Sequence, residues 1–108
     1  MRHCLALDLK NDPALIAEYE RYHEAVWPDV LQSLRDAGIL DMEIYRVENR
    51  LFLILEGDGA FTLERKGEMD AVNPHVQAWE TLMWRYQEAL PTAQPGQKWL
   101  PAKLIFKL

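Results

Sequence analysis

Two pairs of a polar residue followed by proline, Asp12-Pro13 and Asn73-Pro74, fix where helices begin in this 108-residue chain. The polar side chain caps the first turn, and proline at the first helical position needs no N–H donor. After Asp12, apolar residues keep the helical period to about Ala37, and Gly38 is suited to end that helix in a left-handed conformation. Pro28 cannot continue the hydrogen-bond ladder, so we expect this helix to bend or break at Trp27-Pro28.

The segments that flank this helix are short apolar or alternating runs, which are typical of β-strands. His3 to Leu9 is predicted as the first strand. Ile39 to Arg46 and Leu51 to Glu56, joined by Val47-Glu48-Asn49-Arg50, predict a hairpin.

The second half of the chain continues with helical periodicity. A helical region over Phe61 to Val72 restarts at Asn73-Pro74, and Pro91 is predicted to end it. The last apolar run, Leu100 to Leu108, is predicted as the final strand. The restarted helix carries these residues on one face: Trp79, Leu82, Met83, Tyr86 and Leu90.

The resulting order, β-α-β-β-α-β, predicts one α+β domain over residues 1–108. Its antiparallel sheet would carry helices on one face and leave the other face bare. Because exposed apolar surface is unfavourable, we expect a homodimer, with the run Leu104-Ile105-Phe106 as a candidate part of its interface. The alternative is that loops of the same chain cover the sheet.

Composition narrows the class of partner. The net charge of −5, with Lys and Arg scattered among acids, argues against nucleic acid and anionic membranes, and favours a neutral substrate. The single cysteine, Cys4, excludes an internal disulfide framework and a zinc site built on cysteines. The sequence shows no signal peptide or transmembrane run, so we expect a cytoplasmic protein.

Tyr19, His23 and Trp27 occupy positions i, i+4 and i+8 and so project from one side of the predicted helix. Among these side chains, only His23 both gives and takes a proton near neutral pH. A phenol and an indole beside it suit a sugar, and a bend at Pro28 opens room for a ligand. The alternative is that the aromatic residues are core and His23 is a hydrogen-bonded structural residue.

The segment from Glu18 to Pro28, together with Ile44-Tyr45, Glu56 and Val76-Gln77-Ala78-Trp79, resembles the L-rhamnose mutarotase family over nearly the whole chain. The Tyr-x-x-x-His-x-x-x-Trp-Pro core is a fairly specific signature. The resemblance implies a ferredoxin-like dimer that interconverts the α and β pyranose anomers of a deoxyhexose, without cofactor or metal. It places the family's proton donor on His23 and a substrate-binding tyrosine on Tyr19.

The chain departs from the family where substrate choice is expected. The family's second substrate-binding tyrosine falls on Met42, and its pair of tryptophans falls on Trp79 and Glu80. The segment between Trp79 and Pro91 is about one helical turn longer here than in the rhamnose enzymes, so Trp84 is a candidate to fill the space of the missing indole. A family branch resembling this sequence is associated with L-fucose, and the substrate is therefore expected to be L-fucose or L-rhamnose.

Mutarotation removes a proton from the anomeric hydroxyl and delivers one to the ring oxygen, so it needs an acid and a base but no cofactor. His23 suits either role. Glu56, at the end of a predicted strand, is the candidate second group, with a solvated strand end as its alternative. Glu43 and Tyr45 are demoted because they share the strand face opposite to that of Met42. Trp79 is predicted to stack on the sugar, although core packing is equally open.

Two other function classes remain open at this stage. The same β-α-β-β-α-β dimer hosts small monooxygenases and haem-degrading proteins, in which His23 would bind haem or Trp79 would contact an aromatic substrate. A non-catalytic ligand-binding domain, with His23 purely structural, is the other. Anomer exchange observed by NMR separates both of these from the mutarotase.

Overall fold

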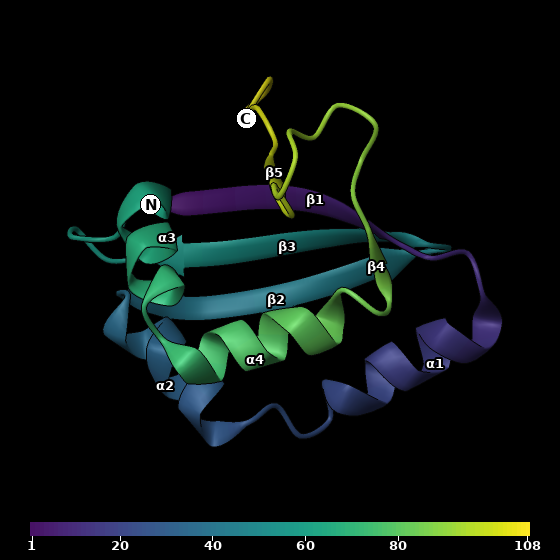
Figure 1. The fold of residues 1–108 in the computed structure, drawn as a ribbon. Coiled ribbons are helices and arrows are strands. Elements are labelled where there is room, and N and C mark those ends of the chain that lie inside the picture. Colours follow the sequence, from purple (N-terminus) through teal and green to yellow (C-terminus); the bar gives the residue numbers. More distant parts are fainter.

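The computed structural model describes residues 1–108, which form a curved antiparallel sheet with all four helices on one side of it (Figure 1). This arrangement confirms the α+β class predicted from the order of the segments. The elements run in the order β1 (Arg2–Leu9), α1 (Pro13–Tyr22), α2 (Pro28–Asp36), β2 (Ile39–Val47), β3 (Arg50–Gly57), α3 (Leu63–Ala71), α4 (Pro74–Met83), β4 (Gln87–Glu88) and β5 (Leu100–Pro101).

The strands are ordered β2-β3-β1-β4 across the sheet, and β5 also pairs with β1. In the antiparallel register, Leu5 lies opposite Leu53 and Leu7 opposite Leu51. Side chains alternate between the faces of a strand, so these leucines share the helix-covered face, and all four are buried. The core therefore lies between the sheet and the helices.

The predicted helix ends are found at three places. Asp12 accepts hydrogen bonds from the N–H groups of Ala14 and Leu15, and Asn73 caps α4 in the same way. Gly38 follows α2 with a φ of 93°, the left-handed conformation predicted for it. These local signals were sufficient to place the starts of α1 and α4 and the end of α2.

The helix predicted to run to about Ala37 is broken, which is one of the two outcomes expected at Trp27-Pro28: α1 ends at Tyr22 and α2 begins at Pro28. Pro28 holds Trp27 in an extended conformation with a ψ of 133°, as expected for a residue before proline. The chain leaves the helix earlier, at His23, which caps the C-terminus of α1. The result is a break of five residues, from His23 to Trp27, rather than a bend.

The second helix is also shorter than predicted: it ends at Met83, not at Pro91. Gln87 and Glu88 form β4, which pairs with the end of β1. The N–H of Lys10 donates to the carbonyl of Tyr86 at 2.8 Å. Hydrogen bonds to the free edge of β1 thus outweigh the helical period of Tyr86 and Leu90, and Tyr86 is fully buried outside the helix.

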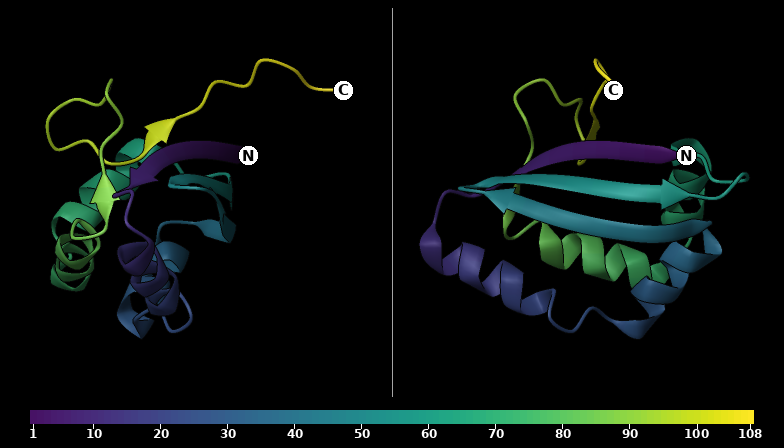
Figure 2. Two further views of the ribbon diagram at one scale, coloured as in Figure 1. Left: turned by 90° about the vertical axis from the view of Figure 1, so that its right-hand side faces the viewer. Right: turned by 180° about the vertical axis from the view of Figure 1, so that it is seen from behind.

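The predicted final strand, Leu100 to Leu108, is wrong over most of its length, since β5 comprises only Leu100–Pro101. β4 and β5 divide the outer edge of β1, one at Asp8–Leu9 and the other at Leu5–Ala6. The N–H of Ala102 still donates to the carbonyl of Cys4, and residues 103–108 run away from the sheet (Figure 2). No helix of the chain has the length and apolar character needed to cross a membrane.

Candidate functional site

A cavity of about 900 Å³ lies between the sheet and the helices. Four of the residues singled out in the sequence line it, one or more from each layer: Tyr19 from α1, His23 just after it, Met42 from β2 and Trp79 from α4. A second hollow of about 370 Å³ also reaches Tyr19 and His23. The fold therefore brings together residues that are far apart in sequence around one ligand-sized space.

His23 is held in one orientation by the end of α1. Its Nδ1 lies 2.8 Å from the backbone carbonyl oxygen of Tyr19. A carbonyl only accepts, so Nδ1 carries the proton in the neutral ring and Nε2 carries the free lone pair. The position at the helix end thus selects the tautomer in which Nε2 serves as the base.

The surroundings of His23 also favour its neutral form. Burial lowers the pKa of His23 below its ordinary value of 6.5, and the hydrogen bond to the Tyr19 carbonyl offsets part of this effect. The imidazole is packed between two rings, with centroids 4.4 Å from Tyr19 and 5.7 Å from Trp79. His23 is therefore a fixed, mostly neutral base at neutral pH.

Tyr19 presents a protonated phenol to the cavity. Its side chain is buried, and its oxygen accepts a hydrogen bond from Nε2 of Gln87 at 3.3 Å. Burial raises the pKa of Tyr19 to about 12, the Gln87 hydrogen bond opposes this shift, and the charge of Glu80 adds to it. The hydroxyl consequently remains a hydrogen-bond donor throughout the physiological range.

The indoles lie in different environments. Trp79 lines the cavity, and Trp27 packs against it edge to face with ring centroids 5.1 Å apart. Trp27 does not line the cavity itself, so it supports Trp79 from behind. Trp99 also lines the cavity. The Trp79 ring is thus available to a ligand, and its contact with Trp27 holds it in place.

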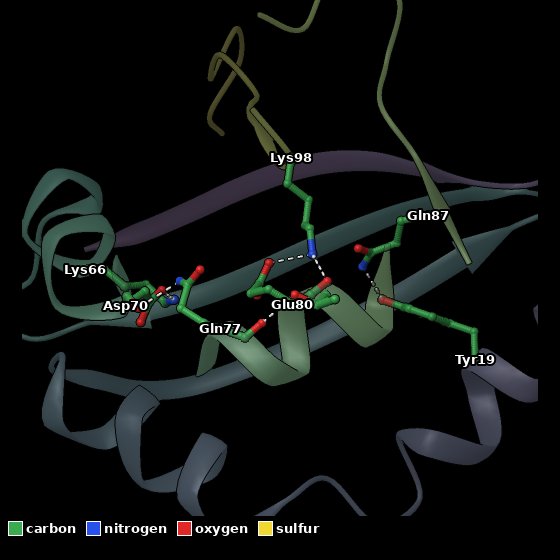
Figure 3. A network of polar contacts seen from close by, with 8 residues as sticks. Tyr19, Lys66, Asp70, Gln77, Glu80, Gln87 and Lys98 are labelled. Carbon is green, nitrogen blue, oxygen red and sulfur yellow. Dashed lines mark hydrogen bonds and ion pairs between the residues drawn. The ribbon is translucent and has the colours of Figure 1, made fainter. Parts of the chain in front are cut away.

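Trp84 lies at the end of α4 and contacts Lys98 rather than the cavity lining. The Lys98 ammonium sits 4.7 Å from the centre of the Trp84 ring. It also lies 2.5 Å from a carboxylate oxygen of Glu80 (Figure 3). Burial lowers the pKa of Lys98, and its ion pair with Glu80 opposes the shift. Glu80 itself lines the cavity, and the ion pair with Lys98 fixes its carboxylate there.

On β2, Met42 and Ile44 line the cavity. Glu43 and Tyr45 project to the opposite face, where the Tyr45 hydroxyl donates to Glu43 at 2.9 Å. The strand faces are therefore those that the alternation predicted. Glu43 and Tyr45 are not part of the main cavity.

Glu56 lies away from the cavity lining. Its carboxylate forms an ion pair with the amino group of Met1 at 3.1 Å and a longer one with Arg2 at 3.9 Å. His75 is exposed and faces Asp29. The structure therefore groups neither Glu56 nor His75 with His23.

Sequence reasoning missed Gln87 and Lys98 and noted Glu80 only as a departure from the family. Gln87 reaches the site because it belongs to β4, whereas the helical period placed it on a helix. Lys98 comes from an irregular segment whose path no periodicity predicts. No three His, Cys, Asp or Glu side chains are grouped as metal ligands would be.

The chain is similar to known sugar mutarotases. A family model described as L-rhamnose mutarotase matches residues 2–108. A relative from Xanthomonas campestris pv. campestris, named L-fucose mutarotase, is 48% identical over 109 residues, covering 99% of this chain and 87% of the relative.

Solved structures show the same fold. The crystal structure of an L-rhamnose mutarotase from Formosa agariphila has a TM-score of 0.75 at 21% identity, covering 100% of this chain and 98% of that one. A dimeric ferredoxin-like protein from an uncultured marine organism has a TM-score of 0.56 at 16% identity, covering 86% and 95%. The ferredoxin-like prediction is therefore confirmed. Because the family match runs from residue 2 to residue 108, the chain belongs to the L-rhamnose mutarotase family.

Proposed function

We propose that this chain interconverts the α and β pyranose anomers of a 6-deoxyhexose, and that its preferred sugar is L-fucose. The observation that carries the proposal is His23, fixed as a neutral base between Tyr19 and Trp79 in the cavity. The choice of L-fucose is supported by the relative of that name at 48% identity. Family membership leaves no support for the haem-binding or non-catalytic alternatives.

The proposed reaction begins when Nε2 of His23 takes the proton of the anomeric hydroxyl. The bond between the anomeric carbon and the ring oxygen breaks, and the ring oxygen gains a proton, which gives the open-chain aldehyde. Rotation about one carbon–carbon bond and attack by the same oxygen on the other carbonyl face produce the second anomer. Protons and electrons balance, and each positioned acid or base contributes roughly 10²- to 10⁴-fold.

We propose Glu80, rather than Glu56, as the partner that exchanges the second proton. Glu80 lines the cavity and follows Trp79 directly on α4, whereas Glu56 is engaged with the N-terminus. The contact with Lys98 at 2.5 Å orders its carboxylate. With the imidazole of His23 as the acceptor, the ring oxygen takes its proton through the Glu80 carboxylate from the Lys98 ammonium that is paired with it, and the proton returns by the same route when the ring closes.

The remaining cavity residues account for sugar binding. The Tyr19 hydroxyl is a donor for a sugar oxygen, and the Trp79 ring offers an apolar face for the pyranose or its 6-methyl group. Met42 adds an apolar contact where the family resemblance places a tyrosine. The lining contains both acidic and basic side chains, which is compatible with a neutral ligand.

We also propose that the chain forms a homodimer through the open face of the sheet. Ala6, Phe52 and Tyr45 form a row across three strands on the face opposite the helices. Beyond them, Leu104, Ile105 and Phe106 are at least 75% exposed. Burying these apolar groups against a second copy would stabilise the dimer by roughly 25 cal/mol per Å².

Saturation-difference NMR on L-fucose, L-rhamnose, D-galactose and D-glucose tests the proposed function. Saturating one anomeric proton transfers saturation to the other anomer only when exchange is fast. We expect the wild-type protein to accelerate exchange of L-fucose most, and L-rhamnose less. Exchange of all four sugars at the uncatalysed rate would contradict the proposal.

A further inference from the structure

The amide of Gln87 is a buried polar group with one end unused. The residue is 4% exposed. Its Nε2 donates to the Tyr19 hydroxyl oxygen, but no donor of the protein reaches Oε1. Gln87 lines the cavity, and in Figure 3 its amide points into the space between Tyr19 and the Glu80–Lys98 pair.

The position of this amide is set by the backbone. In β4, Gln87 pairs with Leu9 of β1, which is itself fully buried. The side chain therefore projects toward the helix-covered side from a fixed strand. The Tyr19 hydroxyl can engage only one end of the amide, so the other end faces the cavity.

An unpartnered acceptor at this depth is unusual, because the large majority of buried polar side-chain atoms have a hydrogen-bond partner. Leaving a buried acceptor without a hydrogen bond destabilises the folded protein. A residue of this kind that also lines a ligand-sized cavity is better explained by the ligand than by the fold.

We propose that Gln87 is a sugar-binding, specificity-determining residue whose Oε1 accepts a hydrogen bond from a hydroxyl of the substrate. This inference rests on the proposed function and deepens it. Because Gln87 occupies a lone pair of the Tyr19 oxygen, the Tyr19 proton is directed elsewhere, toward the ligand. The two side chains together present one donor and one acceptor, which complements a hydroxyl group or two neighbouring hydroxyls.

This pairing implies discrimination among sugars. A site built to hydrogen-bond a hydroxyl rejects an analogue that lacks it, because the buried protein group is then left unpartnered. Gln87 therefore selects a sugar with a hydroxyl at one ring position, and His23 performs the chemistry. As a binding residue, Gln87 should affect KM more than kcat.

The test is a thermodynamic cycle. It measures the binding of L-fucose, and of analogues that each lack one hydroxyl, to the wild type and to the Gln87→Leu variant. We expect Gln87→Leu to weaken L-fucose binding about 3- to 10-fold, as for one neutral hydrogen bond. One deoxy analogue should bind the wild type more weakly than L-fucose does, by the same factor. The variant should bind that analogue as tightly as it binds L-fucose. Gln94→Leu, the same change on an exposed loop, should bind every sugar as the wild type does.

Stability separates binding from a structural role. Gln87→Leu removes an unsatisfied buried acceptor, which is stabilising, and the hydrogen bond to the Tyr19 hydroxyl, which is destabilising, so we expect the unliganded melting temperature to change little. A glutamine retained for the fold alone would lower it clearly when replaced. If Gln87→Leu does not fold, Gln87→Met, whose flexible side chain adapts to the same space, replaces it.

Two results would overturn this inference: Gln87→Leu binds L-fucose as tightly as the wild type does, or the loss of affinity from Gln87→Leu adds to that from every missing hydroxyl. In either case, anomer exchange by the wild type would still uphold the proposed function. A wild type that neither binds nor exchanges any of these sugars would overturn both.

Discussion

At the residue scale, one backbone hydrogen bond determines what His23 can do. The contact from Nδ1 to the Tyr19 carbonyl leaves Nε2 as the only free ring nitrogen. Burial then lowers the pKa of this imidazole. His75 is exposed instead, and its Nδ1 lies 3.4 Å from a carboxylate oxygen of Asp29.

The lowered pKa of His23 predicts a shifted pH profile. If neutral His23 is the base, kcat/KM should stay level as pH falls through 6.5 and decline only below it. The measurement is anomer exchange against pH, with the uncatalysed rate subtracted at each point. An acid limb centred at or above 6.5 would contradict the assignment.

The lowered pKa of His23 should also make the free energy of unfolding depend on pH. The unfolded chain binds the His23 proton more readily, since its pKa there is about 6.5. The contribution of His23 to the free energy of unfolding is therefore unchanged above pH 6.5 and becomes destabilising as pH falls from 6.5 through the folded-state pKa. Denaturant titrations of the wild type and His23→Ala isolate this contribution, because only the wild type should show it.

Met42 predicts a change in sugar preference. It lines the cavity where the family resemblance places a substrate-binding tyrosine. Met42→Tyr adds a donor, and a pocket built around a donor discriminates more strongly. We expect the ratio of L-rhamnose to L-fucose exchange rates to rise. A ratio that stays constant or falls would exclude Met42 from sugar selection.

At the element scale, the parts predicted from sequence are those that local chemistry determines. The side chains of Asp12 and Asn73 accept hydrogen bonds from N–H groups of the first helical turn, and Gly38 adopts the positive φ that ends a helix. Each of these effects acts within a few residues, so the helix ends were predicted correctly. The hairpin followed from alternation alone. These elements place Tyr19, Met42 and Trp79 on the correct faces.

The elements that were predicted wrongly depend on contacts between segments that are distant in sequence. β4 forms because the edge of β1 offers hydrogen bonds to Gln87 and Glu88, and a helical period cannot reveal that edge. Gln87 was missed for this reason. Lys98 reaches Glu80 from an irregular segment, and such a contact has no signature in sequence spacing.

Gly38 provides a prediction about an element boundary. It connects α2 to β2 with a φ of 93°, and a Cβ there would lie 2.5 Å from a carboxylate oxygen of Asp58. Gly38→Ala should therefore lower the free energy of unfolding by more than about 1 kcal/mol. Gly59→Ala, where a Cβ meets nothing within 4 Å, is the matched control. Equal stability of the two variants in denaturant titrations would contradict this account.

At the scale of the whole molecule, the helices cover only one face of the sheet, and the C-terminal residues extend beyond it (Figure 2). Phe106 and Leu108 expose at least 75% of their surface. Apolar groups exposed in this way are typical of a surface that meets a partner. The proposed homodimer supplies that partner without any further component.

Removing residues 103–108 should therefore shift the protein from dimer to monomer. Light scattering after size-exclusion chromatography measures the mass directly. Val72→Ser changes another strongly exposed apolar residue, on the helical side, and should leave the dimer intact. A wild type that is monomeric, or a truncated protein that remains dimeric, would contradict the role given to this segment.

The most direct test of the account compares anomer exchange of L-fucose by the wild type, His23→Ala and His75→Ala, using saturation-difference NMR. We expect His23→Ala to fold and to lose roughly 10²- to 10⁴-fold in rate, because only the positioned proton carrier is removed. His75→Ala should exchange the sugar as the wild type does. Near-normal exchange by a folded His23→Ala protein would show that the reaction does not pass through His23.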